Sequence, residues 1–290
     1  MLNIIILALL WGPSFVFIKL LAYDLPIITL VALRVSIAAA MLLITLRLMK
    51  IKLLSSPRIW AHATVQGFFS CSLPFTLFGF CMIYIPSILG GCINGTIPML
   101  TALLAHFFIA DEKLNKVKVI GILLGLCGFM TLLLPTILDG SIDADTYSIV
   151  ICLSGSMCYA IGMIYARIFL KNLPRYTGPC MQLTTASLYM IPAMLLIDPP
   201  LHLSAINLDT IANMFGLSIL GTALAFIMYF KIVEQSGATY LSMVAYLLPF
   251  TAAMFGVIFL NESISVNFAI AISFIMLGLY CVNRKPKPQG

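Results

Sequence analysis

The sequence predicts an all-α integral membrane protein with ten transmembrane helices, arranged as two inverted five-helix repeats. Three observations predict this fold: the composition, a series of long apolar runs, and a register that repeats between the two halves. Of the 290 residues, 62% are hydrophobic and only 9% are charged, whereas soluble domains contain about 25% charged residues. A chain with so little charge cannot cover its surface in water, so we expect lipid to surround it.

Ten apolar runs are long enough to cross the hydrocarbon core, which takes about 20 helical residues. The runs cover residues 3–21, 26–46, 60–83, 86–110, 117–137, 147–167, 176–197, 211–231, 238–260 and 266–283. The connections between the runs are short, and none is long enough for a soluble domain. No basic region precedes the first run and no small-residue cleavage site follows it, so we interpret it as a retained helix rather than a signal peptide.

The basic residues indicate the orientation of the chain. If the N-terminus is cytoplasmic, all 16 Lys and Arg except Lys19 and Arg34 fall in the inner connections and the tail, which is 14 of 16. Cytoplasmic connections of membrane proteins are rich in Lys and Arg. We therefore expect both termini in the cytoplasm and the chain in a plasma membrane, with the bacterial inner membrane as our first choice. The net charge of +6 then reports topology, and no nucleic-acid partner is expected.

The two halves of the chain share one register. We divide the chain into a first repeat (1–138), an acidic outer linker (139–146), a second repeat (147–283) and a basic tail (284–290). Three residue pairs keep nearly the same offset: Lys19 and Arg167 differ by 148, Pro98 and Pro249 by 151, and Glu112 and Glu262 by 150. Because five is odd, the second repeat enters the membrane from the opposite side. Inverted repeats of this kind are typical of transporters that expose one site to alternate faces.

Four segments carry a resemblance to a known family. They are LLWGPSFVFIK (9–19), PIITLVALR (26–34), PMLTALLAHFFIADEKL (98–114) and the long segment 220–264. In these segments the chain resembles the drug/metabolite transporter superfamily, in its two-domain EamA branch, and the resemblance extends over essentially the whole chain. It implies ten helices, inverted repeats, cytoplasmic termini and a central cavity. It also implies transport of small metabolites, often amino acids or related compounds and commonly outward, without naming one substrate. The sequence departs from the internal register at Asp111-Glu112, by one residue.

The first run contains Trp-Gly-Pro, which would break a helix in water. Backbone groups freed by Pro13 must find partners in protein or in a water-filled cavity, so we expect this helix to face the interior of the bundle. Trp11 and Ser14 lie on one helical face, and Trp11 can offer a stacking surface and an indole donor to a substrate. Packing of Trp11 against a neighbouring helix, or a place in an interfacial belt, is the alternative.

Arg34 lies eight residues after Pro26, about 12 Å into the membrane. A charge at the centre of a membrane helix costs about 3 kcal/mol on insertion scales. Its partner in the repeat register is Gln182, which is also polar. We interpret this pair as substrate-binding residues near the midplane, with Arg34 binding a carboxylate or another anion. The alternative is a structural arginine that bonds to backbone carbonyls or extends toward the membrane surface.

The fourth and ninth runs each contain a proline, Pro98 and Pro249, which we interpret as hinges because proline weakens helical hydrogen bonding. Polar and aromatic residues near them, or in register with Trp11, complete the predicted cavity. These further candidates are Asn94, Thr96, Tyr159, Tyr229, Ser242 and Tyr246. Helix packing through small and polar residues, which is common in membranes, is the alternative for these runs.

The sequence contains no metal-ligand spacing, no phosphate-binding loop and no catalytic triad, so neither an enzyme nor a metal or other cofactor is expected. We predict transport of a small polar metabolite, an amino acid or related compound, by efflux or exchange through a central cavity. The alternative is an uptake carrier or exchanger for a nucleotide-like or other cofactor metabolite. A membrane-embedded enzyme and a structural membrane protein rank behind both. The expected partners are the small-molecule substrate and the lipid bilayer.

Two questions stay open at the level of the sequence. The spacing Gly121-x3-Gly125 fits close helix contact within the chain or a homodimer face.

No acidic residue lies deep in a run, so coupling through a buried carboxylate is not expected. Coupling through the end residues Glu112, Glu234 or Glu262 stays open, and helix capping is the alternative for Glu112 and Glu262.

Overall fold

The computed structural model describes residues 2–110, 112–138, 144–170, 173, 176–198, 206–241 and 243–283, without the side chains of 133–138, 144–145, 230, 233–234 and 236–240. Within these ranges every regular element is a helix, and η1 and η3 have π-helical hydrogen bonding. The elements are α1 (Leu2–Trp11), α2 (Ser14–Asp24), α3 (Ile27–Leu48), α4 (Pro57–Gly67), η1 (Phe68–Ser72), α5 (Leu73–Tyr84), α6 (Ser87–Asn94), α7 (Ile97–Phe108), α8 (Lys116–Leu138), α9 (Ala144–Phe169), α10 (Thr177–Ile197), α11 (Leu208–Phe215), η3 (Gly216–Leu224), α12 (Ala225–Leu241), α13 (Val244–Leu260) and α14 (Val266–Asn283).

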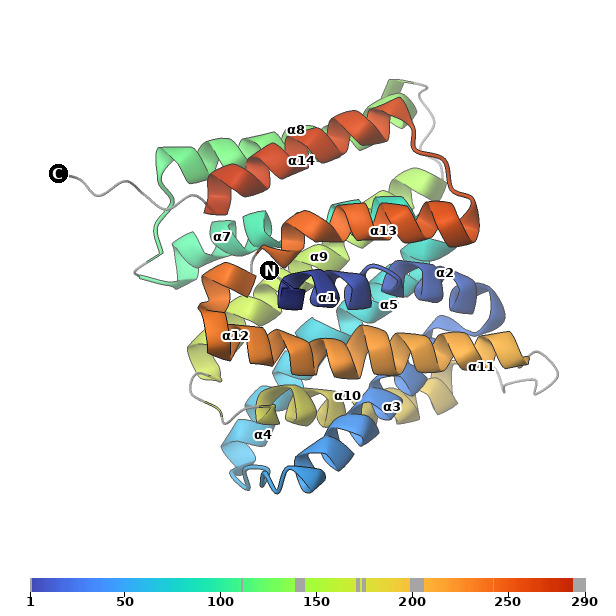
Figure 1. Ribbon diagram of the computed structural model, residues 1–290, viewed down its shortest axis with the longest axis vertical. Coiled ribbons are helices and arrows are strands. Elements are labelled where there is room, and N and C mark those ends of the chain that lie inside the picture. Colours follow the sequence, from blue (N-terminus) through green and yellow to red (C-terminus); the bar gives the residue numbers. More distant parts are fainter. Residues whose placement is uncertain are drawn as a thin grey trace.

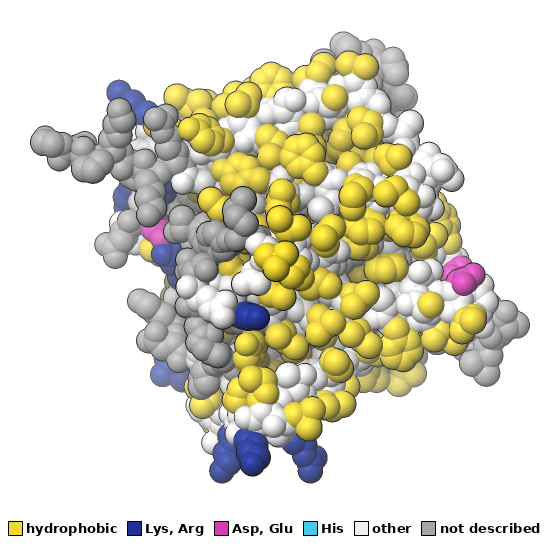
Figure 2. All heavy atoms as spheres, viewed as in Figure 1, with side chains coloured by type: hydrophobic (Ala, Val, Ile, Leu, Met, Phe, Trp, Pro, Cys, Tyr) yellow, Lys and Arg dark blue, Asp and Glu magenta, His cyan; other side chains and the backbone are white. Residues whose placement is uncertain are grey.

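The helices have the length and surface of membrane spans. In the described part of the chain, eight helices are long and apolar enough to cross a membrane, and α13 is a shorter apolar helix. Figure 2 shows hydrophobic side chains over the middle of one face, with most of the visible Lys and Arg toward the left and lower edges. A broad apolar surface with charge kept to its margins is what a lipid environment requires. The predicted integral membrane protein is therefore confirmed.

Prolines explain where several helices begin. Pro26 and Pro86 immediately precede α3 and α6, and Pro57 and Pro98 lie in the first turns of α4 and α7. Proline lacks an N–H group, and the first turn of a helix is the place where that donor is not needed. These four prolines thus mark helix starts that the structure shows, whereas Pro192 and Pro249 lie inside α10 and α13.

The first span is not one helix, because Gly12 and Pro13 form a turn between α1 and α2. Gly12 lies against α13: a side-chain carbon at this position would come within 2.6 Å of Thr251. Trp-Gly-Pro therefore marks an interruption inside the bundle, where the first span meets the ninth. This location agrees with the prediction that the first span faces the protein interior.

The helices form layers, seen in Figure 1 from one side. Helices α8 and α14 lie side by side at the top of that view, with α13 beneath them and α1 and α2 in the middle. Helices α3 and α10 pack on each other at the opposite side of the bundle. The largest cluster of buried apolar residues extends from α2, α3 and α5 to α9, α10 and η3, so one continuous core joins the two halves of the chain.

Gly121 packs inside the chain rather than on its outside. A side-chain carbon at Gly121 would come within 2.6 Å of the Gly278 carbonyl on α14, and one at Gly128 within 2.7 Å of the Ala271 carbonyl. Both glycines therefore permit close contact between α8 and α14. Gly121, one of the two glycines of the predicted contact face, thus packs on α14 within the chain.

Carboxylates bind the starts of helices from other segments. Asp198 Oδ2, at the end of α10, accepts hydrogen bonds from Thr29 N at 2.6 Å and Thr29 Oγ1 at 2.7 Å, in the first turn of α3. Asp24 Oδ2 accepts one from Thr210 Oγ1 at 2.7 Å, in the first turn of α11. Negative charge stabilises helix N-termini because their N–H groups are unpaired. These contacts explain why acidic residues lie at helix ends.

Candidate functional site

Arg34 is buried, with 5% of its surface exposed. Its Nε donates a hydrogen bond to Thr222 Oγ1 at 3.0 Å, and its Cζ lies 3.5 Å from the centroid of the Phe75 ring. Thr222 Oγ1 donates in turn to the Leu217 carbonyl at 2.9 Å, which orients its oxygen toward Arg34. A guanidinium over an aromatic face gains cation–π stabilisation, which is larger where water is excluded.

Four segments meet at this arginine. Arg34 comes from α3, Thr222 from η3 and Phe75 from α5, while Tyr159 of α9 packs against Phe75 with ring centroids 6.2 Å apart. Tyr159 also lies within electrostatic range of Arg34. Two of these segments precede the linker and two follow it, so both halves of the chain build the surroundings of the charge. We call Arg34, Phe75, Tyr159 and Thr222 the Arg34 cluster.

Among the residues that the structure describes, the positive charge in the Arg34 cluster has no anionic partner. Throughout the described ranges, neither a carboxylate nor a backbone carbonyl accepts a hydrogen bond from Arg34. The structural alternative drawn from the sequence, an arginine held by carbonyls, is therefore not the arrangement seen. A buried guanidinium with one hydroxyl partner retains donors for a negatively charged ligand.

Ser14 supplies a second unmatched polar group nearby. Its side chain is buried, and its Oγ has no hydrogen-bond partner among the described residues. The hydroxyl lies against Gly221, directly before Thr222, so closely that a side chain at Gly221 would collide with it. Buried polar groups are nearly always hydrogen-bonded in folded proteins, and an unpaired one calls for a ligand, an ion or a water. Ser14 and Arg34 thus contact consecutive residues of η3.

Sequence reasoning missed Thr222, Phe75 and the two π-helical segments. Thr222 is a polar residue in the middle of the predicted run 211–231, so the criterion of depth that selected Arg34 would also have found it. Phe75 is one of 19 phenylalanines and carries no such signal. The π-helices η1 and η3 occupy corresponding places in the third and eighth spans, and π-helical turns are frequent at functional sites.

Trp11 and Tyr229 form a second group. Their ring centroids are 6.0 Å apart with a tilt of 52°, and both pack on a cluster of buried residues from α1, α12 and α13. The structure therefore brings these two predicted cavity residues together.

Gln182 is buried on α10, and its backbone carbonyl lies against Gly67 of α4. Its helix packs on α3, but no contact of the Gln182 side chain with Arg34 is described.

The fourth span is interrupted between α6 and α7, at Gly95 and Thr96. Thr96 Oγ1 donates to the Ile93 carbonyl at 2.6 Å, so this predicted cavity residue already bonds to its own backbone. Asn94 Oδ1 is buried without a partner in the described chain. Pro249 lies inside α13, with its Cγ 3.3 Å from a side-chain carbon placed on Gly95. The break in the fourth span therefore packs on the proline of the ninth.

Tyr246 forms its hydrogen bonds with α14, which contributes no residue to the Arg34 cluster. Its hydroxyl donates to the Leu279 carbonyl at 3.0 Å and accepts from Asn283 Nδ2 at 3.3 Å, so its partners lie on α14. Ser242, predicted as a cavity residue, lies outside the described residues. The linker and the basic tail proposed from the sequence also lie largely outside them.

Comparisons with known proteins identify one family of membrane transporters. The model of the EamA-like transporter family matches residues 1–134 and 146–284. The uncharacterized transporter YoaV of Bacillus subtilis is 22% identical over 285 residues, 97% of this chain and 95% of that protein. A chloroplastic WAT1-related protein of Arabidopsis thaliana is 27% identical over 220 residues, 70% of this chain but only 49% of its own length. One crystal structure, 20% identical in sequence, covers 97% of this chain and 94% of its own with a TM-score of 0.68, which shows the shared fold.

Proposed function

Since this chain belongs to the EamA-like transporter family, and is a multi-pass membrane transporter rather than an enzyme, we propose that it moves a small polar metabolite that carries a carboxylate. An amino acid or a related compound fits this description, and efflux or exchange is the proposed direction. The substrate binds in a central cavity at the Arg34 cluster.

One observation carries this proposal: Arg34 is buried between both halves of the chain and lacks an anionic partner in the described structure. A carboxylate bound at Arg34 would neutralise the charge through charge-assisted hydrogen bonds, which are about twice as strong as neutral ones. The unpaired hydroxyl of Ser14 is a suitable further contact for the polar part of such a ligand.

Alternating access by ten helices in two inverted repeats is the proposed mechanism. The helix contacts support it, because they recur when the two halves are exchanged. The first span packs on the eighth and ninth, through α1–α12 and α1–α13. In the same way, the sixth span packs on the third and fourth, through α5–α9 and α7–α9.

The family model also matches the two halves separately, at 1–134 and 146–284. Helix α8 provides a 23-residue helix for the fifth span. The excess of basic residues in alternate connections supports cytoplasmic termini in a plasma membrane.

Purified protein in liposomes tests the proposed function. We expect counterflow of a radiolabelled amino acid into preloaded vesicles, and competition by compounds that retain the carboxylate. Matched amides and esters should fail to compete, because they lack the anion that Arg34 would bind. Nucleotide-like anions in the same panel test the alternative cargo. Transport of cations or amides in preference to carboxylates would contradict the proposal.

Pro98 and Pro249 are proposed as the flexing points of the fourth and ninth spans. Pro249→Ala restores a backbone N–H inside α13 and stiffens that helix. Pro98 lies in the first turn of α7, so the N–H gained in Pro98→Ala stiffens the fourth span only if it bonds across the interruption to α6. We expect each variant to favour one of the two access states. A bias of about 1.4 kcal/mol changes their ratio tenfold. Two-sided labelling of a cysteine in the cavity should therefore shift in opposite directions in Pro98→Ala and Pro249→Ala, while the amount of folded protein stays the same. Unchanged labelling in both variants would identify the prolines as packing residues.

A further inference from the structure

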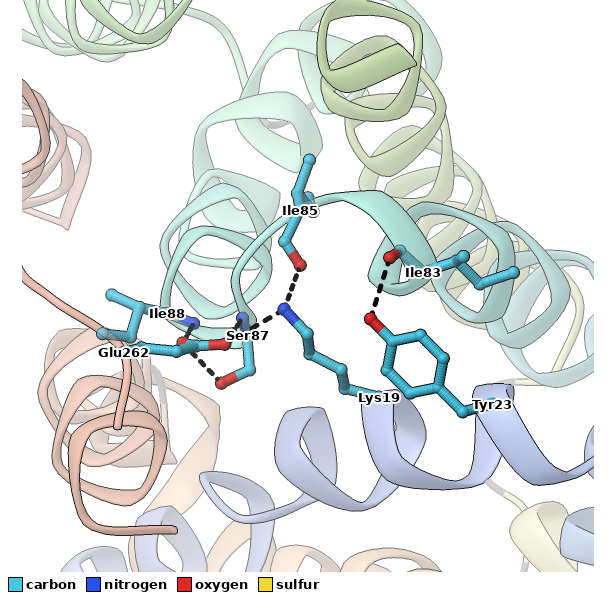
Figure 3. A network of polar contacts seen from close by, with 7 residues as sticks. All are labelled: Lys19, Tyr23, Ile83, Ile85, Ser87, Ile88 and Glu262. Atoms are coloured by element: carbon cyan, nitrogen blue, oxygen red, sulfur yellow. Dashed lines mark hydrogen bonds and ion pairs between the residues drawn. The ribbon is translucent and has the colours of Figure 1, made fainter. Parts of the chain in front are cut away.

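A partly buried polar network joins the middle of α2 to the connection between α13 and α14 (Figure 3). Glu262 Oε1 accepts a hydrogen bond from Ser87 N at 2.7 Å and pairs with Lys19 Nζ at 3.3 Å, while its Oε2 accepts from Ser87 Oγ at 2.9 Å and Ile88 N at 3.0 Å. Lys19 Nζ also donates to the Ile85 carbonyl at 3.0 Å. One carboxylate thus binds both the N-terminus of α6 and the lysine of the first span.

A second ion pair joins Arg167, near the end of α9, to Glu112, in the connection between α7 and α8. Its side chains are 56% and 30% exposed, whereas those of Lys19 and Glu262 are 17% and 9% exposed. Apart from this contact, no side-chain hydrogen bond of Arg167 or Glu112 is described. The second pair is therefore the more accessible to water and the weaker of the two.

The two ion pairs are related by the repeat register. Lys19 corresponds to Arg167 at an offset of 148, and Glu112 corresponds to Glu262 at an offset of 150. In each pair the base lies near the end of the first helix of one repeat, and the acid follows the fourth helix of the other. In Figure 1 the α13–α14 connection lies at the right-hand end of the bundle and the α7–α8 connection at the left-hand end. The same contact is thus built once at each end.

We propose that these ion pairs are the two gates of the transporter, and that opening either end of the cavity requires its own pair to separate. This inference rests on the proposed alternating access. Each pair connects the two repeats, so repeats that move apart at one end must break the pair at that end. Glu262 also holds the start of α6, the helix that leads to the interruption at Gly95 and Thr96. Lys19 lies on α2, five residues beyond Ser14. The Lys19–Glu262 gate is therefore connected along α2 to Ser14 and along α6 to the interruption of the fourth span.

A pair that forms only when its end is closed stabilises that closed state, so its removal shifts the population toward opening at the same end. Lys19→Met removes the cation but leaves the bonds from Ser87 and Ile88 to Glu262 in place, which separates gating from helix capping. Arg167→Met is the matched variant at the other end. A cysteine at Ser14, in a chain whose eight native cysteines have been replaced, reports access to the cavity.

The test measures the rate at which membrane-impermeant maleimide modifies Ser14→Cys in intact cells and in inverted vesicles. We expect Lys19→Met to raise the rate from the Glu262 end about tenfold, and Arg167→Met to raise it from the Glu112 end about threefold, because the exposed pair is weaker. Lys19→Arg should retain the original rates. The double variant Glu112→Arg with Arg167→Glu should restore the rates that Arg167→Met changes.

Labelling needs no substrate, so the outcome is independent of the liposome assay and of whether the cargo has been identified. Elution as a single species in size-exclusion chromatography confirms that each variant is folded, and Lys19→Gln replaces Lys19→Met if the latter is not. Rates that are unchanged in folded variants, or that rise from the same face in both, would overturn the gate proposal. Opposite shifts without carboxylate transport would support the gates and contradict the proposed substrate.

Discussion

Replacing Arg34 by glutamine should lower the transport efficiency for a carboxylate substrate about 100-fold, mainly through a higher half-saturation concentration. Removing one partner of a buried, hydrogen-bonded charge pair costs about 2 to 5 kcal/mol, and a factor of 100 lies within that range. Arg34 is buried in the Arg34 cluster and has no carboxylate partner among the residues described. A substrate anion would therefore lose its main ionic contact in Arg34→Gln. Initial rates of counterflow in liposomes, measured over a series of substrate concentrations, give both parameters.

Two further variants keep the charge of Arg34 but remove a side chain that contacts it. Thr222→Val keeps the guanidinium but removes its only described hydrogen-bond partner, so we expect a smaller loss, about tenfold, from a less well oriented arginine. Phe75→Leu removes the ring that lies 3.5 Å from Arg34 Cζ and should act in the same direction. If Arg34→Gln is folded, loses thermal stability and keeps its original half-saturation concentration, Arg34 is structural and does not belong to the binding site.

Replacing Gly121 by alanine should destabilise the folded protein by about 2 kcal/mol, within the usual range for over-packing. The new carbon would lie 2.6 Å from the Gly278 carbonyl, 2.8 Å from Cys281 Cβ and 2.9 Å from Val282 Cγ2. The first of these neighbours is backbone and cannot rotate away. Helices α8 and α14 would have to separate, and close packing at small residues is what holds membrane helices together. The measurement is the midpoint of thermal unfolding in detergent.

Gly178→Ala is the matched control. At Gly178, also in a helix, the added carbon would meet only Leu173 Cδ1 among the described residues, at 3.4 Å. Alanine is a better helix former than glycine by up to about 1 kcal/mol, so this variant should unfold at the same temperature as the original protein or at a higher one. Equal behaviour of the two variants would contradict the close contact between α8 and α14.

The sequence by itself determined the class of this protein and much of its order along the chain. Hydropathy and run length are local properties, and the bilayer requires about 20 apolar residues for each helix, so apolar spans could be predicted without a structure. Prolines at helix starts are local signals too. The depth of Arg34 follows from its distance from Pro26, and the relation between Lys19 and Arg167, or between Glu112 and Glu262, follows from counting residues. The resemblance to the EamA branch, drawn from such segments, is confirmed by the family match.

Only the tertiary structure decided which of these residues are partners. Arg34 lies 188 residues from Thr222, and Lys19 lies 243 residues from Glu262. Nothing in the local pattern specifies such contacts, because they depend on how the helices rotate and pack against one another. In a membrane, the lipid-facing side of a helix is as apolar as its buried side, so the sequence does not show which side faces the protein. The same limit explains why the bond between Tyr246, chosen with Trp11 and Tyr229 for the cavity, and α14 could not be predicted. A periodic pattern shows which residues share a helix face, and packing alone shows what that face meets.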